Sequence, residues 1–196
     1  MNKKYSVLIA EDESIVLLGL KALLTQLGHT VIGEAHTGQE AVAYCSSLKP
    51  ELLIMDIKMP VLDGIQALEQ INRSRKFKMP CIFISAYSDD NLIERAREAG
   101  VFNYLVKPIR LEDLRAALNI TMQQYREYVQ MVQERDQAKE DLKNRKLIER
   151  AKGILMDNFN MKEKQAMEFM QKKARDSQKK LTVVAQGIIQ MDEALK

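Results

Sequence analysis

The residues best suited to chemistry in this sequence stand where short apolar segments end. Asp56 follows the segment LLIM, and Glu11 and Asp12 follow VLIA. Ser85 ends the segment CIFIS, and Lys107 follows NYLV. Together these groups suit the transfer of a phosphoryl group. A carboxylate attacks the phosphorus, an ammonium group balances the charge on the oxygens, and a hydroxyl donates a hydrogen bond to one of them.

The three acidic residues also suit a metal ion. Carboxylates that share one cleft repel one another unless a cation lies between them. A ligand set made only of oxygen favours a hard ion such as Mg²⁺, which keeps several waters and takes few carboxylates. The alternative is that acidic residues gather at strand ends by chance. A serine and a lysine at the same edge weigh against that alternative.

The elements that must position these residues alternate between strand and helix over the first 117 residues. Hydrophobic patterns predict strands at 5–10, 30–34, 52–55, 81–85 and 102–106. They predict helices at 14–27, 38–48, 64–73 and 89–99, with another from about residue 111. This alternation implies a doubly wound, five-stranded parallel α/β sheet. A flavodoxin-like strand order would place the first and third strands side by side, so that Glu11, Asp12 and Asp56 converge.

Composition is ordinary for a soluble globular protein, with 46% hydrophobic residues in a chain of 196. No apolar run approaches the roughly 20 residues of a membrane span. The short apolar stretch near the N-terminus meets three acidic residues, which is unlike a signal peptide. Cys45 and Cys81 stand apart in apolar surroundings, as expected for free thiols in a reducing cytosol. We therefore expect a cytoplasmic protein with no membrane partner.

Positive charge is concentrated in one block of the chain. Residues 142–180 carry 12 Lys and Arg against 5 Asp and Glu, a balance of +7, whereas the net charge of the whole chain is only +3. The ordinary explanation of a charged helix face is solvation. The lopsided balance favours instead an anionic partner for this block, because Lys and Arg contacts to phosphates supply binding affinity.

A long helix is predicted to follow the sheet, because no proline stands between residues 111 and 156 and the first glycine is Gly153. An apolar stripe with heptad spacing runs through Leu118, Met122, Tyr125, Val129 and Val132. The stripe ends at the polar segment 133–141. Two interpretations stay open: a coiled-coil dimer stalk, or a helix that packs within its own chain.

Three helical patterns fill the remainder, at 142–158, from a cap at Asn160 to about 174, and at 181–194, with a polar connection at 175–180. Glu163 stands where it could return the capping-box bond of Asn160. On the first pattern, one face is apolar and its flanks are basic. The apolar face consists of Leu147, Ile148, Ala151, Ile154 and Leu155. Gly153 lies roughly opposite, which suits either close approach of a ligand or local flexibility.

At the first group of residues the chain resembles the receiver domain of bacterial two-component response regulators. The resemblance covers roughly 1–118 and rests on the acidic pair, the pattern D-x-x-M-P-x-x-D-G from Asp56, the Ser-Ala pair at 85–86 and Lys107-Pro108. It implies that Asp56 accepts a phosphoryl group from the phosphohistidine of a sensor histidine kinase. The sequence departs from the family at Glu11, where an aspartate is more usual.

The resemblance also assigns roles to the neighbours of Asp56. Glu11, Asp12, Asp56 and the backbone carbonyl of Lys58 would hold Mg²⁺. Ser85 and Lys107 would contact the phosphoryl group. Tyr104 stands at the position of the family's switch aromatic, although a half-buried strand residue would look the same in sequence. Phosphorylation adds about 1.5–2 negative charges, and movement of Ser85 toward them would vacate space for Tyr104.

The segment RKLIERAKGILM and the two patterns after it resemble the ANTAR domain, a three-helix RNA-binding module of transcription antiterminators. The resemblance covers about 140–192 and is looser in the second helix, where Met170-Gln171 replaces the usual Leu-Arg pair. It implies binding to paired RNA hairpins beside terminators in mRNA leaders. Phe159 and Phe169 are expected in the core, so contacts from basic residues should dominate over stacking. The candidate RNA-binding residues are Arg145, Lys146, Arg150, Lys152, Gly153, Lys173 and Arg175.

The combined prediction is a phosphorylation-activated antiterminator with three parts: a receiver domain at 1–118, a helical or coiled-coil linker at 119–141 and an ANTAR domain at 142–196. Phosphorylation would favour a homodimer. No enzyme activity is expected beyond self-dephosphorylation at Asp56. One alternative is a phosphorylation-gated DNA-binding transcription factor, which needs a tight helix-turn-helix connection, and 175–180 looks too long and too charged for one. Another is an adaptor that docks an acidic protein.

Overall fold

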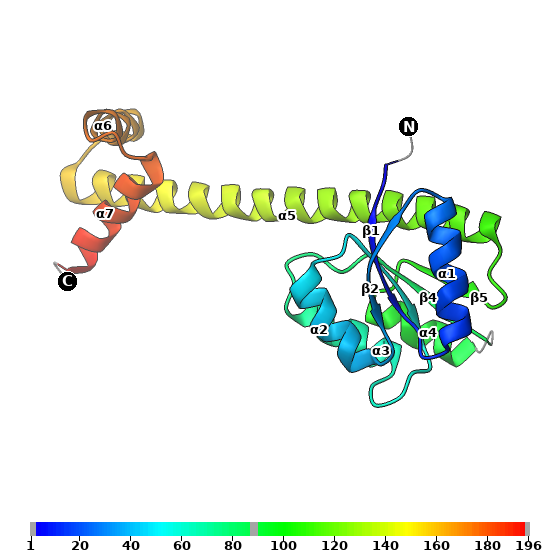
Figure 1. The fold of residues 1–196 in the computed structure, drawn as a ribbon. Coiled ribbons are helices and arrows are strands. Elements are labelled where there is room, and N and C mark those ends of the chain that lie inside the picture. Colours follow the sequence, from blue (N-terminus) through cyan, green and yellow to red (C-terminus); the bar gives the residue numbers. More distant parts are fainter. Residues whose placement is uncertain (1–2, 87–89, 195–196) are drawn as a thin grey trace. The chain divides into compact units, whose positions relative to one another are not determined.

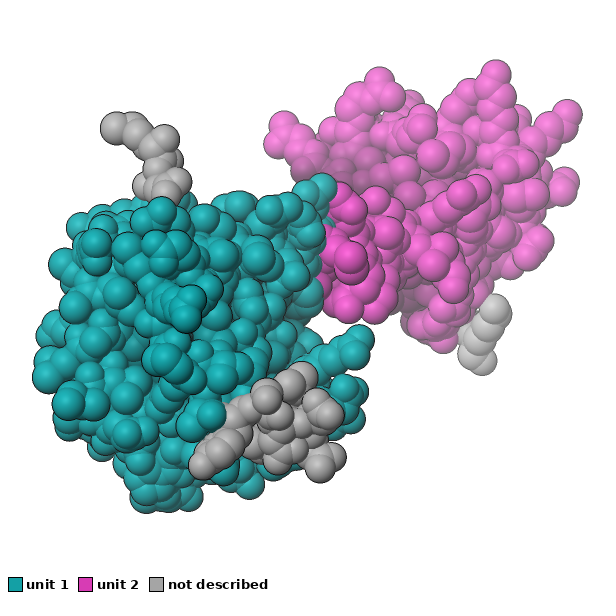
Figure 2. All heavy atoms as spheres, turned by 90° about the vertical axis from the view of Figure 1, so that its right-hand side faces the viewer, with its two compact units in different colours: residues 1–130 teal, residues 131–196 magenta. Residues whose placement is uncertain are grey.

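A computed structural model describes residues 3–86 and 90–194 (Figure 1). The chain divides into two compact units, residues 1–130 and 131–196, which are coloured separately in Figure 2. We describe each unit by itself. Within the described residues, no helix combines the length and the apolar character that a membrane crossing requires.

The first unit is built on a five-stranded parallel sheet. Its strands are β1 (Ser6–Ala10), β2 (Thr30–Ala35), β3 (Leu52–Asp56), β4 (Cys81–Ser85) and β5 (Asn103–Val106). Their order across the sheet is β2-β1-β3-β4-β5, so the predicted flavodoxin-like order is confirmed. Ala10 pairs with Met55, which makes the carboxyl ends of β1 and β3 level. The polar residues that follow these two strands therefore meet at one edge of the sheet.

Helices cover both faces of this sheet. They are α1 (Ser14–Gln26), α2 (Gly38–Leu48), α3 (Gly64–Arg73), α4 (Asp90–Ala99) and the first part of α5 (Leu111–Phe159). Apolar residues of α1 and α5 pack on one face, and those of α2, α3 and α4 pack on the other. Every residue of β3 and β4 is buried. This explains why both strands read as continuous apolar runs rather than as alternating ones.

The predicted elements of this unit agree with the structure to within one or two residues at each end. The fourth helix was expected to begin at residue 89, which lies outside the described residues. The predicted long helix after the sheet is confirmed: α5 is a single helix of 49 residues, and it includes the helical pattern found at 142–158.

The first part of the apolar stripe on α5 packs within its own chain. Leu118 and Met122 are buried in the core that α5 forms with α1, and Tyr125 packs against that core. The ring of Phe102 meets Tyr125 and Tyr128 edge-on, with centroids 5.8 and 5.9 Å away. The intramolecular interpretation therefore holds for positions 118–125. Val129 is half-buried and Val132 is 8% exposed, so none of the five stripe residues is exposed, and a coiled-coil stalk stays an untested prediction.

The second unit is a three-helix module formed by the end of α5, α6 (Glu163–Asp176) and α7 (Leu181–Ala194). Its core joins small and apolar residues from all three helices: Ala151, Leu155, Ala166, Met170, Ala185 and Ile189. Leu147, Ile148 and Ile154 are partly buried against it. The five core positions predicted on the first of these helices are thus confirmed.

Both ends of α6 differ from the prediction. Lys162 rather than Asn160 caps the helix, and Gln165 Oε1 rather than Glu163 accepts the backbone N–H of the cap residue, at 2.9 Å. Asn160 lies outside the helix with φ of 51°, a left-handed conformation that asparagine tolerates well. The helix continues to Asp176, so only residues 177–180 connect it to α7. The length of the connection therefore gives no argument against a helix-turn-helix.

Candidate functional site

The predicted polar residues meet at the carboxyl edge of the sheet. Asp56 and Ser85 are the last residues of β3 and β4, and Lys107 directly follows β5. Backbone hydrogen bonds continue past the strand ends and hold this edge. Lys107 N donates to Ser85 O at 2.9 Å, and Glu11 N donates to Ala35 O at 2.9 Å. The backbone that carries the side chains of Glu11, Ser85 and Lys107 is therefore held in place by hydrogen bonds.

Lys107 is the centre of the site. Its Nζ donates hydrogen bonds to Asp56 Oδ2 at 3.1 Å, to Glu11 Oε1 at 3.0 Å and to Glu13 Oε1 at 3.3 Å. Glu13 was not predicted as part of the site. The signal for it was present in the sequence, because Glu13 is the third acid in the run that begins at Glu11. One ammonium group thus contacts three carboxylates, and the cluster keeps an excess of negative charge.

Burial and charge oppose each other in this cluster. Glu11 is fully buried and Asp56 is 5% exposed. Burial raises the pKa of both carboxyl groups above their ordinary values, and Lys107 offsets part of that effect. Burial lowers the pKa of Lys107, but hydrogen bonds to Glu11 and Asp56 and their charges outweigh it and raise the pKa to about 12. Lys107 is therefore a fixed cation at neutral pH.

The acidic cluster fits a hard metal ion. One carboxylate oxygen from each of Glu11, Asp12 and Asp56 can be chosen so that all three lie within 4.8 Å of one another. Glu11 Oε2 is buried and accepts no hydrogen bond within the described residues, although Lys107 Nζ lies 3.0 Å away. A buried carboxylate oxygen without a hydrogen bond is costly, and a cation would satisfy it. Lys58, whose backbone carbonyl is the further expected ligand, follows β3 with an exposed side chain.

The residues Asp63 and Gly64 shape the loop that follows Asp56. Gly64 N donates to Ile57 O at 2.9 Å, and any Cβ at this position would collide with the backbone carbonyl of Asp56. Asp63 caps α3, since its side chain accepts the backbone N–H of Gln66 at 2.8 Å. The loop therefore passes close to the backbone of Asp56, and only a glycine at position 64 permits this close approach.

Ser85 and Tyr104 occupy neighbouring strands. Ser85 is 1% exposed, and Tyr104 is partly buried against the core on the α2–α4 face of the sheet. Tyr104 pairs in register with Phe83, two residues before Ser85. Ser85 and Tyr104 therefore lie on adjacent strands, as the predicted switch requires. Their roles in such a switch stay predictions.

The predicted RNA-binding residues of the second unit fall into two groups. Two of them form ion pairs between helices. Arg150 lies 2.7 Å from Glu193 of α7, and Lys152 lies 2.7 Å from both Glu149 and Glu163. These pairs link α5 to its two neighbours, so both cations have a structural role whether or not they also contact RNA.

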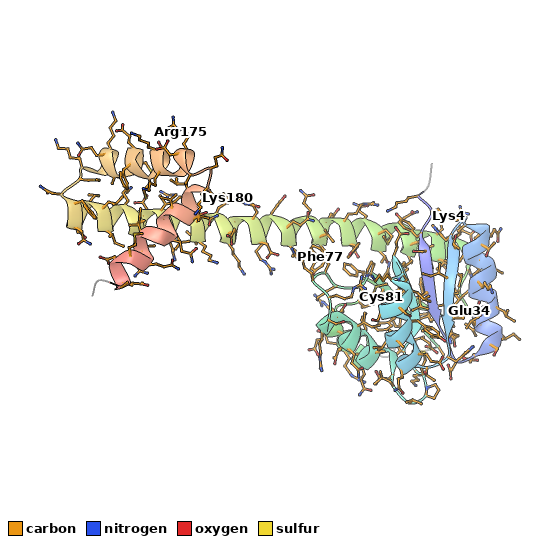
Figure 3. All side chains as sticks on the ribbon, turned by 60° about the vertical axis from the view of Figure 1, so that its left-hand side comes forward. Lys4, Glu34, Phe77, Cys81, Arg175 and Lys180 are labelled. Atoms are coloured by element: carbon orange, nitrogen blue, oxygen red, sulfur yellow. The ribbon has the colours of Figure 1, made fainter. Side chains whose placement is uncertain are left out.

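The other group is open to a partner. Arg145, Lys146, Lys173 and Arg175 are exposed, and among the residues that the structure describes none of them forms an ion pair. Figure 3 labels Arg175, which lies at the end of α6, and Lys180, which lies directly before α7. A Cβ built at Gly153 meets no atom within 4 Å, so packing does not explain this glycine.

The expectation for the two phenylalanines of this unit is wrong. Phe159 is 65% exposed and Phe169 is 42% exposed, so neither is a core residue. Phe159 stands four positions after buried Leu155, a spacing that places the two residues on the same face of a helix. It is the last residue of α5, however, and the helix ends before α6 and α7 can cover it.

Comparison with known proteins gives the same division of the chain. It matches the family model of the response regulator receiver domain over residues 7–119 and that of the ANTAR domain over residues 136–189. It is 40% identical over 184 residues to the transcriptional regulatory protein PdtaR of Mycobacterium tuberculosis, covering 94% of this chain and 89% of that protein. The transcriptional regulatory protein YdfI of Bacillus subtilis is 38% identical over 58% of this chain and 52% of its own length.

Solved structures resemble the first unit. A signal receiver domain of a modulated diguanylate cyclase from Desulfovibrio desulfuricans has a TM-score of 0.58 and 28% identity, over 63% of this chain and 98% of that one. A chain of the CheX–CheY complex with BeF3 and Mg²⁺ from Borrelia burgdorferi has a TM-score of 0.56 and 28% identity. The match covers 58% of this chain and 86% of that one. The chain therefore belongs to the response regulators, with an N-terminal receiver domain and a C-terminal ANTAR domain, and it is a phosphorylation-regulated RNA-binding antiterminator.

Proposed function

We propose that Asp56 accepts a phosphoryl group from the phosphohistidine of a sensor histidine kinase. The observation that carries this proposal is the position of Lys107, which holds a buried aspartate at the end of β3 beside Glu11. In the transfer, a carboxylate oxygen of Asp56 attacks the phosphorus. An O–P bond forms as the N–P bond of the phosphohistidine breaks. The electron pair of that bond returns to the ring nitrogen, and because the other ring nitrogen carries a proton, the imidazole leaves as a neutral group.

The neighbours of Asp56 stabilise the charge that arrives with the phosphoryl group. Glu11, Asp12 and Asp56 would hold Mg²⁺, with the Lys58 carbonyl as a further ligand, and the ion would balance charge on the phosphoryl oxygens. Lys107 already lies within hydrogen-bond distance of Asp56 and can turn to a phosphoryl oxygen without leaving the site. The buried hydroxyl of Ser85 can donate a hydrogen bond to another.

The signal then passes to the surface formed by α4, β5 and α5. Tyr104 lies on β5 beside β4, which carries Ser85, so a shift of Ser85 toward the phosphoryl group changes the space next to Tyr104. This change favours a homodimer through α4, β5 and α5. The two ANTAR domains of the dimer bind paired RNA hairpins in an mRNA leader, and simultaneous binding raises the affinity.

The test is RNA hairpin binding by the whole protein, with and without a small-molecule phosphoryl donor and Mg²⁺. We expect the donor to tighten binding, to add one phosphoryl group by mass and to raise the fraction of dimer. Asp56→Ala should lose all three effects. Asp141→Ala, which changes an exposed acid in the middle of α5, should keep them. If the protein binds RNA equally tightly with and without the donor, and Asp56→Ala binds as the wild type does, the RNA-binding module stands and the phosphorylation switch is rejected.

A second arm of the same assay addresses the alternative of DNA binding. The connection at 177–180 is short enough for a helix-turn-helix, so duplex DNA belongs in the test as a competitor. We expect unlabelled hairpin RNA to displace the labelled hairpin, and duplex DNA of equal phosphate content to displace it poorly. Equal displacement by duplex DNA would contradict specific RNA recognition.

A further inference from the structure

The second unit contains a large apolar cavity beside its basic residues. The cavity has a volume of about 680 Å³ and lies where the end of α5 meets α6 and α7. Its lining includes Phe159, Phe169, Val183, Ile188, Met191 and Lys173. Its size falls within the range of roughly 300–1,000 Å³ typical of sites for small organic groups.

The aromatic rings of this cavity are available to a ligand. Phe159 and Phe169 are 65% and 42% exposed, and Met191 beside them is 72% exposed. Neither ring belongs to the core of the unit, which contains Leu155, Met170 and Ile189 among others. Two half-open phenyl rings around a cavity are therefore free to stack on a flat partner.

Polar and charged groups stand around the apolar lining. Lys173 and Lys179 bring two ammonium groups to it. Asn158 and Asp192 also line it, and Asn158 Nδ2 donates to Asp192 Oδ1 at 2.7 Å. That bond orients the amide, so that the carbonyl oxygen of Asn158 is left to accept a hydrogen bond from a ligand.

We propose that this cavity receives an unstacked base from the loop of an RNA hairpin. The base stacks on Phe159 and Phe169, and Lys173 and Lys179 contact the adjacent phosphates. This inference rests on the proposed function, and it adds the site on the protein that binds a base of the RNA loop. Stacking of single-stranded bases on aromatic rings is a general mode of RNA recognition, and a cavity that is both aromatic and lined with lysine matches a ligand that is both flat and anionic.

Charge argues against a second copy of the chain as the occupant. Residues 142–180 have a balance of +7 and supply all of the cavity lining outside α7. A symmetric contact would bring two such blocks together, and like charges repel. RNA instead places its phosphates against the lysines.

The experiment measures binding of the full, phosphorylated chain to a pool of RNA hairpins with one common stem and a randomised loop. Phe159→Leu and Phe169→Leu keep an apolar side chain and remove the ring. Stacking on an aromatic ring accounts for roughly tenfold or more in affinity per base, so we expect each variant to bind about tenfold more weakly. Phe77→Leu, a partly buried phenylalanine of the receiver unit, is the matched control and should bind normally.

Salt dependence separates stacking from phosphate contacts. The two leucine variants should lose affinity at every salt concentration with an unchanged slope of log affinity against log salt. Lys173→Ala should reduce that slope, because it removes a phosphate contact. A 2-aminopurine placed in the loop should report stacking by a change in fluorescence on the wild-type protein, and this change should be smaller on Phe159→Leu.

Each remaining outcome decides the question. If both leucine variants remain folded by circular dichroism and bind hairpins as the wild type does, the inference is overturned and the proposed function stands. If the wild type binds no hairpin at all, the proposed function itself fails. If the variants no longer form the dimer but keep their affinity for RNA, the cavity is an interface between two copies of the chain, and the inference is overturned.

Discussion

Lys107 Nζ lies 3.1 Å from Asp56 Oδ2, and the same ammonium group lies 3.0 Å from Glu11 Oε1. One cation thus serves both as the partner of Asp56, the proposed phosphoryl acceptor, and as the counterion of a fully buried glutamate. The lysine keeps two buried carboxylates close together. Under the proposed function, it is already in place to contact the oxygens of a phosphoryl group on Asp56.

The first prediction concerns the loss of this cation. Lys107→Met leaves Glu11 and Asp56 buried without a positive charge, and breaking a buried ion pair in this way is strongly destabilising. We expect the free energy of unfolding to fall by about 3 kcal/mol in urea titrations without Mg²⁺. Added Mg²⁺ should restore much of the loss. Lys21→Met, which removes the exposed pair with Glu34, should cost less than about 1 kcal/mol; equal losses for the two variants would contradict the argument.

The second prediction concerns the charge of Asp56 itself. Burial raises the pKa of this carboxyl group, which means that the folded state tolerates its negative charge less well than the unfolded state does. Asp56→Asn should therefore raise the free energy of unfolding without Mg²⁺, by on the order of 1 kcal/mol. Mg²⁺ should stabilise the wild type more than the variant. Asp141→Asn serves as the exposed control, and a stabilisation of similar size there would show that burial is not the cause.

Much of this site could be predicted from the sequence because each residue follows an apolar strand directly. Parallel strands bring their carboxyl ends to one edge, so Glu11, Asp56 and Lys107 required only the order of the strands to be placed together. Glu13 was missed because its distance to Lys107 depends on the path of a loop, which periodicity does not describe.

The second unit was harder to predict for a physical reason. Helical periodicity tells which residues share a face, as it did for Ala151 and Leu155, but it does not tell where neighbouring helices stop covering that face. Phe159 lies on the continuation of an apolar face and is nevertheless exposed, because α5 ends there. The cap of α6 also depended on loop conformation, with Asn160 in a left-handed state.

The third prediction concerns backbone strain in the loop that follows Asp56, the proposed phosphorylation site. Val61 has φ of 69° and is 81% exposed, and a β-branched residue is poorly suited to the left-handed region. Val61→Asn should raise the free energy of unfolding by about 1 kcal/mol, with Val61→Ala in between. The same change at exposed Val106 in β5 should instead lower it. Thermal unfolding of the three variants tests the order, and stabilisation at both valines would point to a cause other than strain.

The fourth prediction is a pH dependence of stability that arises at His29. Its Nδ1 accepts the backbone N–H of Tyr5 at 3.2 Å, and burial lowers its pKa below the ordinary 6.5. The unfolded chain therefore binds a proton more readily than the folded chain does. The contribution of His29 to the free energy of unfolding is fully present above pH 6.5. It is lost as the pH falls from 6.5 through the lower pKa that His29 has in the folded state.

The measurement for His29 is a series of urea titrations between pH 7.5 and about pH 5. His29→Asn keeps an acceptor for the Tyr5 N–H and cannot be protonated, so its stability should fall less over this range. Glu51 does not interfere: its pKa is held below the ordinary 4.5 by the backbone N–H of Ser6, so its contribution is lost only at lower pH. Parallel curves for the wild type and His29→Asn would reject the role of His29.

The fifth prediction separates the two explanations of Gly153. No atom lies within 4 Å of a Cβ built at this position, and the same is true of Gly19 in the interior of α1. Replacing an interior helical glycine by alanine stabilises a helix by about 1 kcal/mol, so both Gly153→Ala and Gly19→Ala should raise the free energy of unfolding. Only Gly153→Ala should weaken binding to hairpin RNA, because a methyl group would then stand between the backbone of α5 and the ligand. If both variants are stabilised and both bind RNA as the wild type does, no ligand approaches the backbone here, and local flexibility of α5 is the better explanation of this glycine.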